Sequence, residues 1–189
     1  MKIITYNVNG IRSAFRKNWL SWLQATDADV VCLQEIKCTP DQLTDLLLVE
    51  QMGYEHYWYP AEKKGYSGTA IFTRHTPKHV EDGCGIEEYD RGGRIIRVDF
   101  EDLSVMSTYF PSGSSGDLRQ DFKFRFLEDF QAYVDKLKWY YPNLVISGDY
   151  NICHKPIDIH NPKSNARSSG FLPEEREWME NFVNSGFID

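Results

Sequence analysis

Four places in the sequence put oxygen-bearing side chains directly after a run of residues that favours a β-strand. These residues are Asn7 and Asn9, Glu35, Tyr109, and Asp149 with Asn151. Two carboxylates with carboxamides and a phenol, without a Cys and His ligand set, suit a hard cation such as magnesium. A bound magnesium neutralises charge on a phosphate ester while a carboxylate activates water. The residue types therefore point to phosphate-ester hydrolysis.

Each of these residues also has an ordinary structural explanation when it is taken alone. Asn9 before Gly10 is typical of a turn, and a lone carboxylate such as Glu35 is usually a surface charge. Tyr109 could lie at the edge of the core, and Asp149 could cap a turn. The set favours a site because α/β folds build their sites at strand ends on one rim. The sequence has no G-x-S-x-G motif, which argues against a serine hydrolase. It also has no P-loop or Rossmann glycine pattern, so a nucleotide-binding site is not supported.

Strand and helix patterns alternate along the chain and predict one α/β domain with mixed sheets. Apolar and β-branched runs predict strands over 3–8, 29–35, 66–73, 94–100, 103–109 and 143–149. Apolar spacing and capping signals predict helices over 14–26, from Thr39-Pro40-Asp41-Gln42 to Gly53, over 118–141, and from Leu172 to Gly186. We expect exposed loops over 82–93 and 155–170.

The amino-acid composition limits which partners the protein can bind and indicates where in the cell it is located. The 189 residues carry 21 Lys and Arg against 28 Asp and Glu, a net charge of −7, so nucleic acid would have to bind at a local basic face or through a bridging cation. The four cysteines form no C-x-x-C pair, which excludes a zinc ribbon, and Cys32 is expected to be a buried hydrophobe. No apolar stretch reaches the ~18 residues of a membrane span, and the chain opens on a strand pattern, without a signal peptide. We therefore expect a cytoplasmic protein without membrane contact.

An ordered set of short motifs identifies a resemblance that covers the whole chain. In order, they are Tyr6-Asn7-Val8-Asn9-Gly10-Ile11-Arg12, Leu33-Gln34-Glu35-Ile36-Lys37, Gly68-Thr69-Ala70, Gly92-Gly93-Arg94, Tyr109-Phe110-Pro111, Ser147-Gly148-Asp149-Tyr150-Asn151, Asn161-Pro162-Lys163 and Gly170-Phe171-Leu172-Pro173-Glu174-Glu175-Arg176. Together these motifs resemble the exonuclease III family of AP endonucleases, in the endonuclease/exonuclease/phosphatase superfamily.

The resemblance implies a fold and an extent for the domain. The fold is a four-layer α/β sandwich of two facing mixed β-sheets flanked by helices, with residues 1–189 as a single domain. Family members continue past the position of Asp189, through a segment that holds a Ser-Asp-His motif and the last strands. We therefore expect the domain to lack its C-terminal segment and the 189-residue chain to be poorly active on its own.

The resemblance also implies roles at the site. Glu35 would be the main magnesium ligand, with Asn7 a second candidate and Mn²⁺ a substitute for Mg²⁺. Asp149 would act on the attacking water, as general base or as its orienting acceptor. Asn151 and Asn7 would position the scissile phosphate, and Tyr109 would contact it and support developing charge.

DNA contacts are expected from loops that carry cations and polar groups. Ser112 follows Tyr109-Phe110-Pro111 where some branches of the family carry Asn or Gln, which weakens the case for a carboxamide contact there. Further basic residues, Arg16, Lys17, Lys64 and Lys155, lie in the same clusters. The predicted DNA-binding residues are Arg12, Lys63, Tyr66, Ser112, Lys163, Asn165 and Arg167.

The function implied is magnesium-dependent DNA repair. The enzyme would hydrolyse the phosphodiester 5′ to abasic sites and act as a 3′-phosphodiesterase and 3′→5′ exodeoxyribonuclease on double-stranded DNA. Its partners would be double-stranded DNA, abasic sites and 3′ ends, with no protein partner and a monomeric state when complete. Two alternatives stay open: a superfamily phosphatase or phosphodiesterase acting on a small phosphate ester, and a DNA-binding fragment without catalysis.

Overall fold

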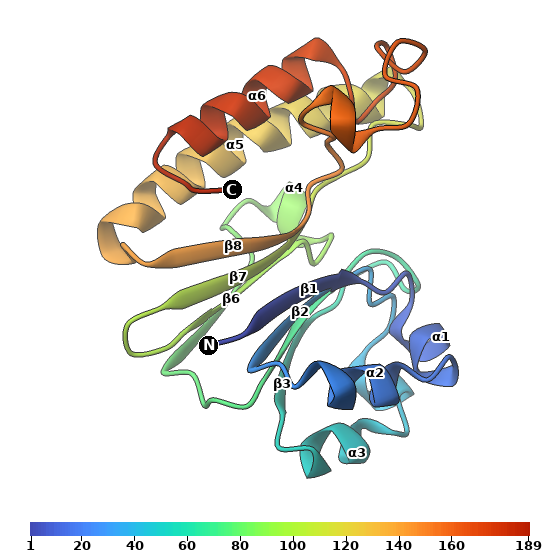
Figure 1. Ribbon diagram of the computed structural model, residues 1–189, viewed down its shortest axis with the longest axis vertical. Coiled ribbons are helices and arrows are strands. Elements are labelled where there is room, and N and C mark those ends of the chain that lie inside the picture. The colour runs from blue at the N-terminus through green and yellow to red at the C-terminus, as the bar shows by residue number, and fades with distance from the viewer. The chain divides into compact units, whose positions relative to one another are not determined.

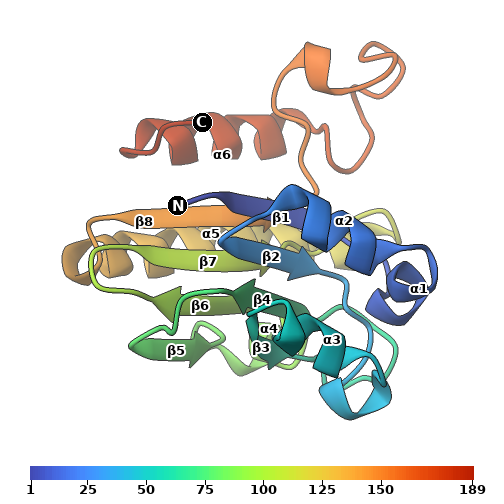
Figure 2. The ribbon, with the colours of Figure 1, turned by 60° about the horizontal axis from the view of Figure 1, so that its bottom comes forward.

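The computed structural model describes residues 1–189, which divide into two compact units. The first unit comprises Met1–Tyr109 and Lys138–Asp149, and the second comprises Phe110–Leu137 and Tyr150–Asp189. Figures 1 and 2 follow the chain through both units. Each unit is described separately below, and the single domain expected over 1–189 stays a prediction. None of the helices combines the length and the apolar character that crossing a bilayer requires.

The first sheet of the first unit has the order β1-β2-β4-β3. Its strands are β1 (Ile3–Asn7), β2 (Val30–Gln34), β3 (Glu55–Tyr59) and β4 (Thr69–Thr73). One face is covered by the helices α1 (Ile11–Arg16), α2 (Trp19–Thr26) and α3 (Leu46–Gln51). On that face Val31 and Leu33 of β2 and Phe72 of β4 share a core with Leu23 of α2 and Val49 of α3. The strong apolar character of β2 follows from this burial, because all five of its residues are buried.

The second sheet of the same unit faces the first across an apolar layer. It has the order β5-β6-β7-β8, with β5 (His79–Asp82), β6 (Ile95–Asp99), β7 (Ser104–Tyr109) and β8 (Leu144–Asp149), and the short helix α4 (Glu87–Asp90) lies between β5 and β6 in the chain. Val30, Cys32 and Ile71 of the first sheet pack with Val98 and Val105 of the second. Cys32 is fully buried, as predicted, and the expected pair of facing mixed sheets is confirmed.

Two parallel strand pairs bring the predicted site residues to strand ends. β1 pairs with β2 in parallel, with Asn7 opposite Gln34. β7 pairs with β8 in parallel, with Tyr109 opposite Asp149. Because parallel neighbours end at the same edge of a sheet, each pair delivers its polar residues together.

The second unit is built on an aromatic core between two helices. These are α5 (Asp117–Tyr140), whose last three residues lie in the first unit, and α6 (Pro173–Asn184). The ring of Phe110 lies 4.9 Å from that of Phe126 and 4.8 Å from that of Phe130, and Trp178 stacks on Phe182 at 4.9 Å. The segment between β8 and α6 is irregular, as predicted, apart from a 3₁₀ turn at Pro156–Asp158.

Two predicted helices are interrupted. The helix expected over 14–26 is two helices, because Asn18 takes a left-handed backbone conformation (φ 64°) between α1 and α2. The helix expected from Thr39 to Gly53 is a 3₁₀ turn at Pro40–Gln42 followed by α3. The amide of Thr39 donates to Oε1 of Gln42 at 3.2 Å, so the capping signal is used by a single turn.

Two strands and one short helix were not predicted. β3 carries His56, Tyr57 and Trp58, and although its aromatic residues favour a strand, it lacks the alternation of apolar and polar residues that marks one. β5 ends at Asp82, and α4 occupies part of the expected 82–93 loop because its Tyr89 is buried. β3 and β5 extend the two sheets at one edge each, and the predicted fold class is unchanged.

Gly148 is a position where any side chain would disturb the site, because β8 lies very close to β7 there. A Cβ atom on Gly148 would stand 1.9 Å from the main-chain oxygen of Thr108. We expect Gly148→Ala to lower the free energy of unfolding by about 1–3 kcal/mol or more, measured by denaturant titration. Gly65→Ala is the matched control, since Gly65 also has a positive φ (77°) but has open space around it. Equal losses in the two variants would contradict this packing argument.

Candidate active site

The side-chain amide of Asn7 joins the two predicted carboxylates. Its Nδ2 donates to Oε1 of Glu35 at 2.8 Å and to Oδ2 of Asp149 at 2.8 Å. Asn7 ends β1, Glu35 follows β2, and Asp149 ends β8, so three strand ends meet at one point of the first unit. The prediction that Glu35 and Asp149 approach one another is confirmed, although the two residues lie 114 positions apart in the sequence.

A buried polar bridge joins the two sheets directly beneath this point. Nε2 of Gln34 donates to Oγ of Ser107 at 3.0 Å, and that hydroxyl donates to the main-chain oxygen of Leu33 at 3.1 Å. Gln34 is 1% exposed and Ser107 is fully buried. Buried hydrogen bonds of this kind fix a relative position more firmly than apolar contacts do. Glu35, the next residue after Gln34, is therefore anchored to both sheets.

Glu35 itself has a left-handed backbone (φ 53°) that turns its side chain out of the strand. The main-chain oxygen of Glu35 accepts from the amide of Gly10 at 2.7 Å, and the next amide, of Ile36, donates to the oxygen of Gly68 at 3.2 Å. A non-glycine residue held in this conformation costs about 1–3 kcal/mol and is concentrated at functional sites. The surrounding hydrogen bonds maintain the conformation against that cost.

The electrostatics of Glu35 keep its carboxylate ionised. Burial raises its pKa, but hydrogen bonds from Asn7, Lys37 and Tyr109 outweigh burial and hold the pKa below its usual range. Nζ of Lys37 lies 2.7 Å from Oε2 of Glu35 and also donates to Oδ1 of Asn9. Glu35 therefore carries a full negative charge at neutral pH, as a cation ligand must.

Tyr109 is protonated in the same surroundings. Burial, together with the charge of Glu35 and the hydrogen bond to it, raises the pKa of Tyr109 to about 12. The guanidinium of Arg94 lies 5.5 Å from the Tyr109 ring and donates from Nη1 to the main-chain oxygen of Tyr109 at 3.1 Å. A phenol that keeps its proton at neutral pH can donate a hydrogen bond to an anionic oxygen, as Tyr109 does to the carboxylate of Glu35.

Lys37→Met should move the pH dependence of the site upward. A carboxyl whose folded-state pKa is lowered keeps its charge above its ordinary pKa of about 4.3 and loses it as the pH falls through the lower value. Removing Lys37 removes one of the interactions that lower the pKa of Glu35. We expect the acid limb of the kcat/KM profile to shift to higher pH relative to the control Lys136→Met, an exposed position on α5. An unchanged acid limb would show that Lys37 does not set this pKa.

The donor set fits a magnesium ion. Its candidates are the ionised carboxylate of Glu35, the carboxylate of Asp149 and the carboxamide of Asn7, all oxygen donors at one point. Residues 1–189 contain no group of three or more His, Cys, Asp or Glu residues suited to a metal. Magnesium usually takes one or two protein carboxylates and keeps several waters, so a small set suffices.

Residues 4–187 match the model of the Endonuclease/Exonuclease/phosphatase family. The chain belongs to this family.

Named relatives of this family member are nucleases. It is 40% identical over 190 residues to an exodeoxyribonuclease of Bacillus subtilis and 38% identical over 190 residues to the DNA repair nuclease APEX1 of Danio rerio. The whole chain is covered in both, and it spans 73% of the first protein and 61% of the second. The expected class of hydrolytic enzyme is therefore confirmed.

Solved structures agree with the fold of this family member. An AP endonuclease from Archaeoglobus fulgidus matches with a TM-score of 0.89 and 28% identity, over 100% of this chain and 72% of that one. A 3′ phosphatase from Neisseria bound to a product DNA hairpin matches with a TM-score of 0.88 and 25% identity, over 98% and 71%. The predicted fold class is thus that of the AP endonucleases.

Asn151 of this family member lies in the second unit, two residues after Asp149. Its backbone is left-handed (φ 50°), and its Nδ2 donates to the main-chain oxygen of Phe110 at 2.8 Å. Its proposed contact with a phosphate stays a prediction.

The predicted DNA-binding residues lie on the surface of their units. Lys63 stands 3.8 Å over the ring of Tyr66, and both are exposed. Ser112 is exposed and shares a hydrogen bond of 2.9 Å with Ser114. Asn165 uses its Nδ2 within its own loop, where it donates to the main-chain oxygen of His160 at 2.8 Å. The remaining predicted residues are also exposed: Arg12, Lys163 and Arg167.

Two residues near the carboxylates were given no role from the sequence. Lys37 pairs with Glu35, and Arg94 contacts Tyr109. Both lie inside the quoted motifs, in Leu33-Gln34-Glu35-Ile36-Lys37 and Gly92-Gly93-Arg94. For Lys37 the sequence offered one signal, namely a lysine two positions after Glu35, the predicted metal ligand.

Proposed function

We propose that the whole protein containing these 189 residues is a magnesium-dependent DNA-repair nuclease. It cleaves the phosphodiester 5′ to abasic sites and removes groups or nucleotides from 3′ ends of double-stranded DNA. The observation that carries the proposal is the Asn7 amide shared at 2.8 Å between Glu35 and Asp149. Relatives named as an exodeoxyribonuclease and as a DNA repair nuclease support this substrate.

The residues of the site divide the hydrolysis between them. Asp149 takes a proton from the attacking water, or orients it, while a bond forms between the water oxygen and phosphorus. The phosphorus–oxygen bond to the leaving strand breaks, and the freed oxygen takes up a proton from solvent water. Tyr109, protonated at neutral pH, donates to a phosphoryl oxygen whose charge grows in the transition state. Asn151 and Asn7 hold the phosphate in place.

Glu35 would hold the magnesium ion, with Asn7 as a further oxygen donor. When bound, the ion would neutralise negative charge on the phosphate. Asn7 holds the carboxylates of Glu35 and Asp149 near each other, because its Nδ2 donates to both. Mn²⁺ has the same preference for oxygen ligands and is expected to substitute.

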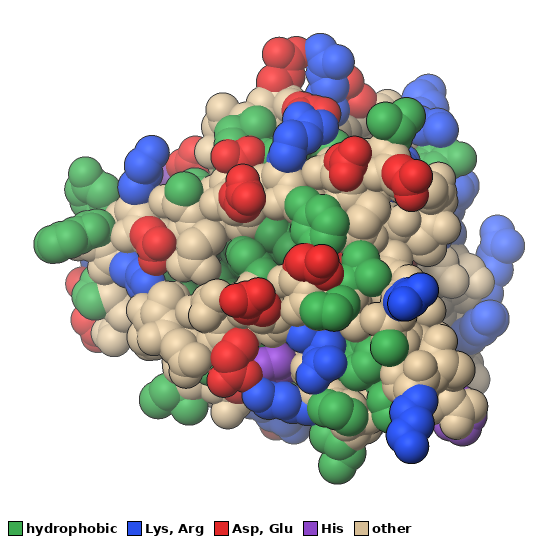
Figure 3. All heavy atoms as spheres, turned by 90° about the horizontal axis from the view of Figure 1, so that it is seen from above, with side chains coloured by type: hydrophobic (Ala, Val, Ile, Leu, Met, Phe, Trp, Pro, Cys, Tyr) green, Lys and Arg blue, Asp and Glu red, His purple; other side chains and the backbone are tan.

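DNA would bind through local cations against an acidic background. With a net charge of −7, affinity must come from clusters such as Lys63 with Tyr66 and the loop of Lys163 and Arg167. On the face shown in Figure 3, acidic and basic side chains are interspersed, so no single-sign surface dominates there. We expect steep salt dependence of binding, as for any protein that contacts several phosphates.

A monomeric state and a cytoplasmic location belong to the same proposal. All four cysteines are free, which suits a reducing compartment. The bacterial relative is an exodeoxyribonuclease, whose substrate would lie in that compartment. A small phosphate ester is the less favoured substrate, since the named relatives act in DNA repair or as exodeoxyribonucleases.

The test is cleavage of a labelled duplex that carries one abasic-site analogue. The whole protein should cut it 5′ to the analogue with magnesium and lose that activity with a chelator. An undamaged duplex and p-nitrophenyl phosphate serve as comparison substrates. Faster hydrolysis of the small ester than of the abasic duplex would overturn the proposal in favour of a phosphatase.

A further inference from the structure

An ion pair is completely buried in the second unit. Lys123 of α5 and Glu175 in the first turn of α6 are both 0% exposed, with Nζ 2.6 Å from Oε1. Burying two charges costs several kcal/mol per ion, so such a pair contributes little net stability compared with well-packed apolar residues. The hydrogen bonds of the two residues indicate that the pair positions neighbouring segments of the chain.

Lys123 holds the beginning of the segment that follows β8. Its Nζ donates to the main-chain oxygen of Asn151 at 2.7 Å. Asn151 has a left-handed backbone, a conformation that asparagine tolerates better than most other non-glycine residues, and its side chain donates to the main-chain oxygen of Phe110. The ammonium thus fixes the peptide group of a residue whose carboxamide is proposed to contact phosphate.

Glu175 holds the end of the same segment. Its Oε2 accepts from the amides of Gly170 at 2.6 Å and Leu172 at 3.0 Å, and its Oε1 also accepts from Nε2 of Gln120 at 3.0 Å. The oxygen of Gly170 accepts in turn from the amide of Cys153 at 2.7 Å. The two ends of the segment are therefore joined to each other and to one buried charge pair.

The part of the chain between these ends is largely exposed and irregular. It contains Lys163, Asn165 and Arg167, the residues predicted to contact DNA. An exposed loop is placed mainly by the groups that fix its two ends. The charge pair thus controls the placement of both Asn151 and the loop.

We propose that the buried Lys123–Glu175 pair positions Asn151 and the base of the 152–169 loop for reaction with DNA. The inference rests on the proposed function for the role of Asn151. Neither residue touches substrate; both act through the main chain of other residues. The effect on turnover is large because a misplacement of about 1 Å in a catalytic group can cost ~100-fold in rate.

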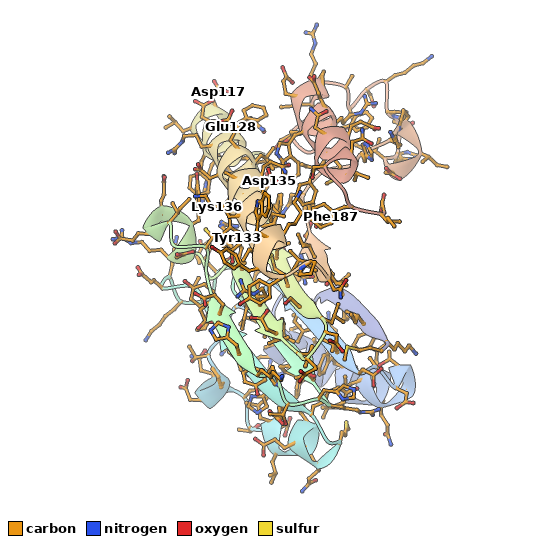
Figure 4. All side chains as sticks on the ribbon, turned by 90° about the vertical axis from the view of Figure 1, so that its left-hand side faces the viewer. Asp117, Glu128, Tyr133, Asp135, Lys136 and Phe187 are labelled. Carbon is orange, nitrogen blue, oxygen red and sulfur yellow. The ribbon has the colours of Figure 1, made fainter.

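The test removes the charges while keeping the fold, in the whole protein. Lys123→Met combined with Glu175→Leu replaces the pair with apolar side chains and leaves no unpaired buried charge. We expect a folded protein with a lower melting temperature, because the amides of Gly170 and Leu172 lose their acceptor and the oxygen of Asn151 loses its donor. We also expect a kcat on abasic duplex lower by about 10–100-fold and faster hydrogen exchange at those two amides. The control is Lys136→Met, an exposed lysine labelled near the C-terminal end of α5 in Figure 4.

A folded double variant with kcat within about twofold of the unchanged protein, and with unchanged exchange, would overturn the inference. Should the double variant fail to fold, Lys123→Gln combined with Glu175→Gln gives the same decision, since it keeps both side-chain lengths and leaves no buried charge. Unchanged exchange and turnover in that variant would again overturn the inference. Asn151→Ala separates the two proposals. If that change leaves kcat intact, the role proposed for Asn151 fails, and the exchange rates at Gly170 and Leu172 alone decide whether the pair holds the loop.

Discussion

Asp149→Asn should lower kcat on an abasic duplex by about 10²–10⁴-fold in the whole protein, with only a small change in Kd for DNA. The substitution keeps the size of the side chain and an oxygen that can accept from Nδ2 of Asn7, now at 2.8 Å from Oδ2. It removes the basic group that takes or orients the proton of water. Transition-state stabilisation is then lost while ground-state binding stays, which reduces kcat without a matching rise in KM.

The measurement pairs single-turnover cleavage with equilibrium DNA binding. Asp135→Asn is the matched control, because Asp135 is an exposed aspartate on α5, labelled in Figure 4. Losses of similar size in binding and in turnover would mean that Asp149 shapes the DNA groove and does not act on water.

Glu35→Gln is expected to have a comparably large effect through the metal. The variant keeps an oxygen for the hydrogen bonds from Asn7 and Tyr109 but removes the negative charge that pairs with Lys37 and would bind the cation. We expect kcat to fall on the order of 10²–10³-fold at fixed magnesium, as when one electrostatic stabilising group is lost. The magnesium concentration for half-maximal activity should rise as well.

A magnesium titration of activity, supported by calorimetry of magnesium binding, checks this expectation. Glu128→Gln, at an exposed position on α5 labelled in Figure 4, is the control. A lower kcat with an unchanged magnesium requirement would remove Glu35 from the metal site and leave it a role in placing Asn7.

The sequence predicted the site residues better than their contacts. Apolar runs that stop at a polar residue are local patterns, so the strand ends at Asn7, Glu35 and Asp149 could be located. The shared amide of Asn7 could not, because it depends on side-chain positions set by two sheets and their Gln34–Ser107 bridge. The left-handed backbone of Glu35 is likewise imposed by surrounding hydrogen bonds and leaves no local pattern.

Helix breaks and buried charges were the harder features to predict. Asn18 interrupts a helical pattern of apolar residues that is otherwise continuous, because a single left-handed residue leaves the spacing almost unchanged. Lys123 lies in a long helix with many charged residues, where a lysine is normally solvated. Its burial depends on the partner Glu175, which is 52 residues away in the sequence.

The order in which the chain is synthesised has a consequence for the site. Asn7, Glu35 and Tyr109 belong to the first stretch of the first unit, but Asp149 returns to it only after Phe110–Leu137, which belongs to the second. The 40 residues from Tyr109 to Asp149 take about 2–8 s to translate at typical ribosomal rates. During that interval β7 lacks its parallel partner and the nascent chain lacks one of its two carboxylates. A ribosome-bound chain therefore cannot complete the active site until β8 has been synthesised and has left the ribosome.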